Sequence, residues 1–204
     1  MKKDLFVLAA IGLVIAIGLA IAVARGALPL LRVFNPLANW SLTKSLVVLA
    51  IAVAAMVLSE RAIRWTDRGL PWPSATLEWV YSSERAAHIV EDYANQRPQA
   101  VRGVLIDSFA FIPFYTLSIA ILCFVVARGW TSSHWAAWTV AAGWSVAFAA
   151  AFDYLENAGI LAALGGVTTR LAPLTYGACQ LKWVIACAAL DFAIIALIAR
   201  VFGR

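Results

Sequence analysis

Charged side chains are scarce in this 204-residue sequence: Asp, Glu, Lys and Arg together make up 13% of it, against about 25% in soluble domains. Hydrophobic residues make up 63%, and the mean hydropathy is +0.85. A soluble domain of this size could not bury so much apolar surface in its core. Disorder is also excluded, because it requires low hydrophobicity and high charge. The composition therefore predicts a multi-pass membrane protein.

The sequence also lacks the residue patterns of several common functional sites. Its three cysteines form no Cys-x-x-Cys pair and each lies in an apolar run, which predicts small buried residues rather than disulfides or zinc ligands. They are Cys123, Cys179 and Cys187. There is no nucleophile elbow, zinc-protease motif or phosphate-binding glycine loop. The sequence therefore leaves the cofactor unknown, and it leaves open whether the protein is an enzyme.

The net charge is +5, with 16 Lys and Arg against 11 Asp and Glu. The basic residues lie mostly at the ends of apolar runs, which is typical of topology signals and of contacts with lipid head groups. We therefore predict membrane lipids as partners and no binding to nucleic acid. The N-terminus and the segment 60–102 carry more basic residues than the opposite side, which predicts that both are cytoplasmic.

Five apolar runs are long enough to cross a bilayer, which takes about 20 helical residues. They cover residues 5–24, 42–59, 101–127, 135–164 and 171–202. We expect the first to stay as an uncleaved anchor, because the apolar part of a secretory signal is shorter. Pro113 is expected to kink the third run. These runs predict an all-α polytopic membrane helix bundle that forms a single domain over residues 1–204.

A shorter helix is expected between the second and third runs. Ser82 can cap a helix over residues 83–96, and Pro98 is expected to end it. Apolar residues at helical spacing give this helix one apolar face. They are Ala86, Ile89, Val90 and Tyr93. The pattern predicts an amphipathic helix on the cytoplasmic side, lying on the membrane surface or against the bundle.

The most specific polar signal is the string Asp153-Tyr154-Leu155-Glu156-Asn157 inside the fourth run. Asp153, Glu156 and Asn157 are three and four positions apart, so they share one face of a helix. Two carboxylates this close in a low dielectric cannot both ionise cheaply. One of them is expected to hold a proton, bind a cation or pair with a base.

Lys182 and Asp107 are predicted to lie at the same depth as this string. Lys182 follows the turn near Thr169 by about as many residues as the string precedes it, so antiparallel helices would bring them together. Asp107 lies roughly two turns into the third run, which enters from the same side. The three acids and one lysine leave room for a cation, a proton or another basic group such as Arg102. The predicted ligand- or ion-binding residues are Asp107, Asp153, Glu156, Asn157 and Lys182.

The amphipathic helix holds a weaker set of candidate metal ligands. His88 is followed by Glu91 and Asp92 at three and four positions, a spacing that can hold a metal ion. The same spacing is common on solvated helices. We therefore predict no metal site and keep these three residues as weak candidates only.

The polar residues also recur in a distinctive order over roughly residues 75–195. The order is the helix Glu84–Tyr93, Asp107 followed by Phe111, Pro113 and Tyr115, the Asp153–Asn157 string, and Leu181-Lys182-Trp183. In this order the chain resembles a group of bacterial multi-pass inner-membrane proteins of uncharacterised activity, and the Asp-x-x-Glu-Asn string is the specific element. The resemblance implies a location in the bacterial inner (plasma) membrane and no particular chemistry.

Three functions fit the sequence. In the first, the cluster binds a cation, a proton or a lipid head group: Glu156 and Asp153 are the anionic ligands or proton carriers, and Asp107 is a third acid. Asn157 would fix orientation and Lys182 would balance charge. In the second, the protein is a structural or assembly subunit of a membrane complex. In the third, it is a lipid-modifying enzyme in which paired carboxylates act as acid and base. A homo-oligomer and a larger membrane complex both remain open.

Overall fold

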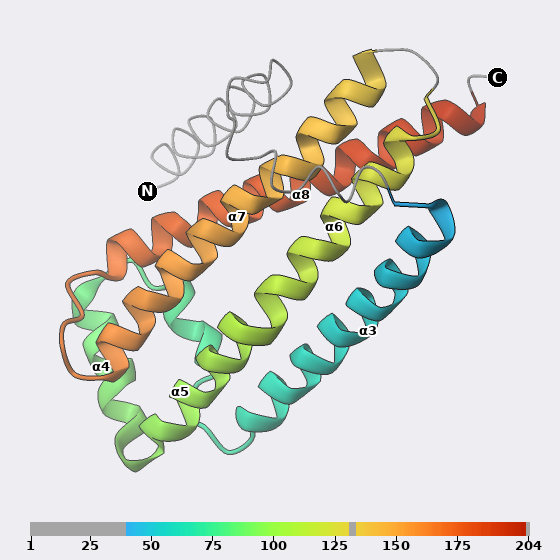
Figure 1. Ribbon diagram of the computed structural model, residues 1–204. Helices are drawn as coiled ribbons and strands as arrows, with labels where there is room; N and C mark the ends of the chain where they lie inside the picture. Colours follow the sequence, from blue (N-terminus) through green and yellow to red (C-terminus); the bar gives the residue numbers. More distant parts are fainter. Residues whose placement is uncertain (1–39, 131–133, 203–204) are drawn as a thin grey trace. The chain divides into compact units, whose positions relative to one another are not determined.

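A computed structural model describes residues 40–130 and 134–202, and within these ranges the chain is helical and contains no strand (Figure 1). The predicted span 5–24 lies outside the described residues. The elements are α3 (Leu42–Thr66), η2 (Ser74–Trp79), α4 (Ser83–Tyr93), η3 (Ala94–Gln96), α5 (Arg97–Ile106), the π-helical turn η4 (Asp107–Phe111), α6 (Ile112–Ala127), α7 (His134–Leu164) and α8 (Ala172–Phe202). The all-α helix bundle predicted from composition is confirmed.

Four helical stretches are long and apolar enough to cross a membrane. They are Leu42–Thr66, Ser83–Ala127, His134–Leu164 and Ala172–Phe202. The predicted runs 135–164 and 171–202 match α7 and α8 to within one residue at each end. α3 continues past the predicted end at Ser59, and its last turns carry a Glu60–Arg64 ion pair of 2.7 Å at helical spacing. Apolar length therefore located α7 and α8 closely but did not give the end of α3.

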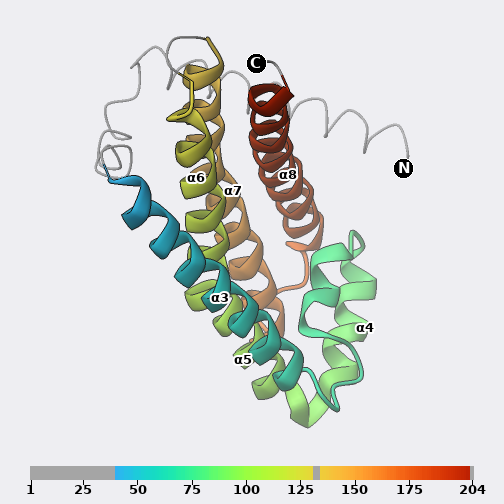
Figure 2. The same ribbon diagram turned by 90° about the vertical axis from the view of Figure 1, so that its right-hand side faces the viewer.

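The predicted amphipathic helix is confirmed in α4, but its end was predicted wrongly. The Ser82 hydroxyl accepts a hydrogen bond from the Arg85 backbone N–H at 3.3 Å, as expected of an N-cap. The helix ends at Tyr93, and the φ of +41° at the next residue, Ala94, turns the backbone out of the helical path. Pro98 instead lies in the first turn of α5, where its missing N–H costs no helical hydrogen bond. The chain reverses direction between α4 and α5 (Figure 2).

A π-helical turn lies directly before Pro113, the residue at which a kink was predicted. The Ile112 backbone N–H donates to the carbonyl of Asp107, five positions back instead of four. Pro113 follows directly and has no N–H to offer to an α-helical bond. Asp107 thereby occupies the first position of a widened turn, a feature that is frequent at functional sites.

Contacts among the described residues divide the chain into two compact units. Unit 2 consists of Ala54–Phe114 and Ala150–Lys182, and unit 1 contains the remaining described residues. The apolar core of unit 2 joins one face of α4 to α5, the end of α7 and the start of α8. It includes Ile89, Val90, Tyr93, Ala100, Val104, Ile160, Leu164 and Ala172. This core holds α4 against the helices that carry the predicted polar residues.

Unit 1 is packed largely by small side chains and aromatic rings. Phe124 and Trp144 meet edge to face, with ring centroids 5.4 Å apart. The Cys123 thiol donates to the carbonyl of Ala189 at 3.8 Å. Two of the three cysteines are buried as predicted, but Cys187 is exposed. Its place within an apolar run did not distinguish the face of α8 on which it lies.

Candidate functional site

Lys182 lies among buried carboxylates in unit 2. Its ammonium nitrogen Nζ is 2.8 Å from Asp153 Oδ1 and 2.9 Å from Glu156 Oε1, and both contacts are hydrogen bonds. A third carboxylate oxygen, Glu78 Oε2, lies 3.5 Å from the same nitrogen. Asp153 is 2% exposed, Glu156 0% and Lys182 8%. We refer to Glu78, Asp153, Glu156, Cys179 and Lys182 as the Lys182 cluster.

A glycine allows the two helices that carry most of this cluster to approach closely. A Cβ atom on Gly159 of α7 would overlap the Thr175 hydroxyl oxygen of α8. Small residues at such crossings bring helix backbones together in membrane proteins. One turn before Gly159, Glu156 therefore meets the side chains that follow Thr175 on α8, Cys179 and Lys182.

Glu78 was not predicted as a site residue. It comes from η2, a short 3-10 helix in the segment between α3 and α4, outside the membrane-length helices. Its neighbours Leu77 and Val80 are buried in the core of unit 2, which directs the Glu78 side chain inward to 13% exposure. The signal in the sequence was a single acid within the apolar stretch Leu77–Tyr81, which is atypical of a solvated loop.

The electrostatics of Glu78 reflect this burial. Loss of water raises the pKa of Glu78 above its ordinary value, and the Lys182 ammonium offsets part of the rise. The carboxyl groups of Glu78 and Glu156 also lie within hydrogen-bonding reach of each other. Two ionised carboxylates offer acceptors only, so this contact becomes a hydrogen bond when one of them carries a proton.

Asn157 connects Asp107 to the site. Its side-chain nitrogen Nδ2 donates to Asp107 Oδ2 at 2.6 Å and to the Ser108 hydroxyl at 3.0 Å. Ser108 in turn donates to the Val104 carbonyl at 2.8 Å. The structure therefore places all five predicted residues in unit 2, in two groups that are each held by hydrogen bonds. One group is Asp153, Glu156 and Lys182, and the other is Asp107 and Asn157.

Three side chains of the cluster present ligand atoms to a common point. One atom from each of Glu78, Glu156 and Cys179 lies within 4.8 Å of the other two. The Cys179 sulfur is 4.0 Å from Glu78 Oε2, and Cys179 is fully buried. Glu156 Oε2 is buried and has no hydrogen-bond donor. The cluster thus combines a carboxylate excess with an unsatisfied buried acceptor.

The weak metal candidates on α4 lie at the surface. His88 Nδ1 is 3.7 Å from Glu91 Oε2, and these side chains are 80% and 72% exposed. Asp92 instead accepts a hydrogen bond of 2.9 Å from the Trp72 indole. The structure therefore brings two of the three residues together and directs the third to the loop before η2.

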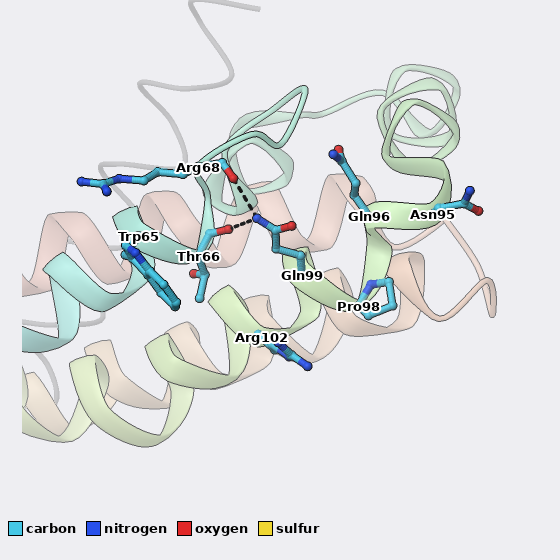
Figure 3. Close-up of a pocket in the computed structure, with 8 residues that line it drawn as sticks. All are labelled: Trp65, Thr66, Arg68, Asn95, Gln96, Pro98, Gln99 and Arg102. Atoms are coloured by element: carbon cyan, nitrogen blue, oxygen red, sulfur yellow. Dashed lines mark hydrogen bonds between the residues drawn. The ribbon is translucent and has the colours of Figure 1, made fainter.

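A pocket of about 480 Å³ lies elsewhere in unit 2 (Figure 3). It is lined by Trp65, Thr66, Arg68, Asn95, Gln96, Pro98, Gln99 and Arg102. The Gln99 amide donates to the backbone carbonyls of Thr66 and Arg68, which ties the end of α3 to the start of α5. Arg68 and Arg102 extend from this tie in different directions. Arg102, a possible extra cation for the cluster on sequence grounds, is an exposed residue of this pocket.

No family model, curated protein or solved structure matches the chain. The resemblance to bacterial inner-membrane proteins therefore stays a prediction. The chemistry of the site has to be inferred from its own geometry, in which three carboxylates, one ammonium and one thiol are buried together.

Proposed function

We propose that this chain is an integral membrane protein whose Lys182 cluster binds one exchangeable cation, either a proton or a metal ion. The observation that carries the proposal is the excess of buried acid: Glu78, Asp153 and Glu156 surround a single ammonium group. An uncompensated charge inside a protein costs several kcal/mol. Lys182 can neutralise one carboxylate, so the remaining charge requires another cation.

A proton is the occupant that needs the least rearrangement. The Glu78 and Glu156 carboxyl groups face each other, and a proton between them would provide the donor that Glu156 Oε2 lacks. Lys182 meanwhile holds Asp153 and the other oxygen of Glu156, Oε1. In this arrangement the lysine fixes the geometry of the acids, and the site gains or loses a single positive charge.

Burial argues against the lipid-based functions for the same cluster. Glu156 is fully buried and Asp153 almost so, whereas acid–base action on a lipid requires contact with the reacting atoms. We infer a bacterial inner-membrane location from the resemblance in the order of the polar residues. The distribution of basic residues supports an N-terminus in the cytoplasm.

Infrared difference spectroscopy of the full chain in detergent tests the proposal. Wild type should show a protonated-carboxyl stretching band at neutral pH that disappears when the site is deprotonated or filled by a metal ion. Glu156→Gln should remove this band, because it takes away one half of the facing acid pair. Glu60→Gln is the matched control, since Glu60 forms an exposed ion pair with Arg64. A cation site is excluded if Glu156→Gln and Glu60→Gln give the same spectrum as wild type.

The pocket in Figure 3 supports a second candidate function, contact with an anionic lipid head group. Trp65 is 68% exposed at the end of the apolar helix α3, the usual position of tryptophan at a membrane interface. Arg68 and Arg102 supply positive charge to the same pocket. Nanodiscs that contain phosphatidylglycerol should be bound more tightly than those of phosphatidylcholine alone. Arg68→Gln with Arg102→Gln should abolish this preference, whereas Arg85→Gln on α4 should keep it.

A further inference from the structure

The fully buried thiol of Cys179 distinguishes this site from an ordinary acid pair. Glu78, Glu156 and Cys179 together offer two oxygen atoms and one sulfur atom within 4.8 Å of one another. In a tetrahedral zinc site such atoms lie about 3.5 Å apart, given metal–ligand distances of about 2.0 to 2.3 Å. A contraction of about 1 Å is within the range of side-chain rotation. Glu156 Oε2, buried without a donor, is already available as a ligand atom.

We propose that the cation bound by this protein is a borderline divalent transition metal of the Zn²⁺ class, held by Glu78, Glu156 and Cys179. This inference rests on the proposed cation-binding function and names its ligand. A thiolate favours zinc and similar metals over Mg²⁺ and Ca²⁺, which prefer oxygen ligands. Three protein ligands leave the fourth tetrahedral position for water or another donor.

Charge balance supports the assignment. Two carboxylates and one thiolate around a divalent ion sum to one negative charge, while Lys182 and Asp153 neutralise each other across 2.8 Å. Binding therefore leaves one net negative charge, against two for three free carboxylates beside one ammonium. The incoming metal displaces the Cys179 thiol proton and the proton between Glu78 and Glu156. Uptake of one metal ion should release about two protons to solvent.

Lys182 acts in this scheme as a positioning residue. It holds Glu156 through Oε1, which leaves Oε2 for the metal. It also keeps Asp153 out of the coordination sphere by hydrogen bonding. The donor set is then restricted to one oxygen from Glu156, one from Glu78 and the sulfur, which is too few ligands for Ca²⁺.

Titration of the full chain with Co²⁺ in detergent is the direct test. Wild type should bind one Co²⁺ per chain with a thiolate-to-cobalt charge-transfer band in the near ultraviolet and release about two protons, which a pH indicator counts. Zn²⁺ should displace the bound Co²⁺ and so abolish the band, whereas Mg²⁺ should not. Cys179→Ser should abolish the band and weaken binding by 100-fold or more. Cys123→Ser is the matched control, because Cys123 is also buried but bonds to a backbone carbonyl in unit 1.

Two further variants separate the possible failures. Glu78 lies outside the membrane-length helices. Glu78→Gln should weaken Co²⁺ binding even if Cys179→Ser fails to fold. The metal inference is overturned if wild type shows no thiolate band, or if Cys179→Ser keeps it. If the infrared carboxyl band is still lost in Glu156→Gln, the cation site remains with a proton as its ligand. If that band is also unchanged, the proposed function fails together with the inference.

Discussion

The Lys182 ammonium lies 3.5 Å from the Glu78 carboxylate, so a short helix outside the membrane-length segments supplies one wall of a site otherwise carried by α7 and α8. The contact makes the fold of the η2 segment part of the site. A change that moves η2 should therefore alter cation binding without touching either long helix. It also means that a fragment consisting of α7 and α8 alone would lack one of the proposed ligands.

Removing the lysine should destabilise the protein strongly. Lys182→Met would leave Asp153 and Glu156 without their buried counter-charge, which typically costs about 3–5 kcal/mol. The free energy of unfolding can be measured by titration from mild detergent into dodecyl sulfate. Lys44→Met is the matched control, because Lys44 is exposed over the Trp40 ring at 4.5 Å and should contribute about 1 kcal/mol or less. Equal stability of the two variants would show that Lys182 does not neutralise the buried acids.

The stability of unit 2 should depend on pH through Asp67. Burial raises the pKa of Asp67 above its ordinary value of 3.8, although hydrogen bonds from Ser74 offset part of the rise. One oxygen of this carboxyl, Oδ1, is buried without a donor. A group whose pKa is raised by folding stabilises the folded state at low pH. That contribution is lost as pH rises from the unfolded-state value through the folded-state value.

Asp67→Asn tests this dependence. The amide cannot ionise, so the variant should gain stability relative to wild type as pH rises from about 4 to about 8. Thermal unfolding midpoints across this range give the comparison. Glu91→Gln, which changes an exposed carboxylate on α4, should leave the wild-type slope intact. The attribution to Asp67 would be wrong if both substitutions shifted the profile equally.

A single methyl group at Gly103 should displace η2. A Cβ atom there would lie 2.6 Å from the Ser74 hydroxyl oxygen, 3.0 Å from Ser74 Cβ and 3.3 Å from Asp67 Oδ1. Gly103→Ala should therefore cost about 1–3 kcal/mol by overpacking. It should also weaken Co²⁺ binding, because Ser74 begins the helix that carries Glu78. Gly177→Ala is the matched control: nothing lies within 4 Å of its added Cβ, and alanine in a helix is expected to be neutral or stabilising.

Loss of the Asn157 amide should destabilise the fold, because Asp107 loses a hydrogen-bond donor. Asn157→Leu removes the donor to the partly buried Asp107 Oδ2 and to the buried Ser108 hydroxyl, and loss of the donor to a buried acceptor costs about 1–3 kcal/mol. Asn95→Leu, at an exposed residue of the pocket, should change stability by about 0.5 kcal/mol or less. Dodecyl sulfate titration of both variants measures the two changes in the free energy of unfolding. A similar small effect in both would mean that the Asn157 network contributes little to the fold.

The helices of this protein could be predicted because a bilayer-crossing helix leaves a strong signal in apolar length. α7 and α8 were located to within one residue at each end, and the shared face of Asp153, Glu156 and Asn157 followed from helical periodicity. The meeting of this face with Lys182 followed from antiparallel register alone. Local signals were therefore sufficient for the pairing of α7 with α8.

The remaining features depend on backbone geometry and tertiary packing. The break at Ala94 could not be predicted, because alanine carries none of the turn preferences of Gly or Asn at positive φ. Glu78 enters the site only because Leu77 and Val80 are buried beside it. No periodic pattern in the sequence predicts the burial of these two residues. The exposure of Cys187 likewise depends on which face of α8 other helices cover.

The π-helical turn at Asp107–Phe111 has an evolutionary consequence. Such a turn holds one residue more than an α-helical turn, so it is the natural position at which a single-codon insertion or deletion could be absorbed. Deleting one of the residues after Asp107 would restore a regular α-helical turn and leave the helices on either side in phase. Asp107 would then still be directed at Asn157. Length variation at this turn in related chains is therefore compatible with retention of both residues.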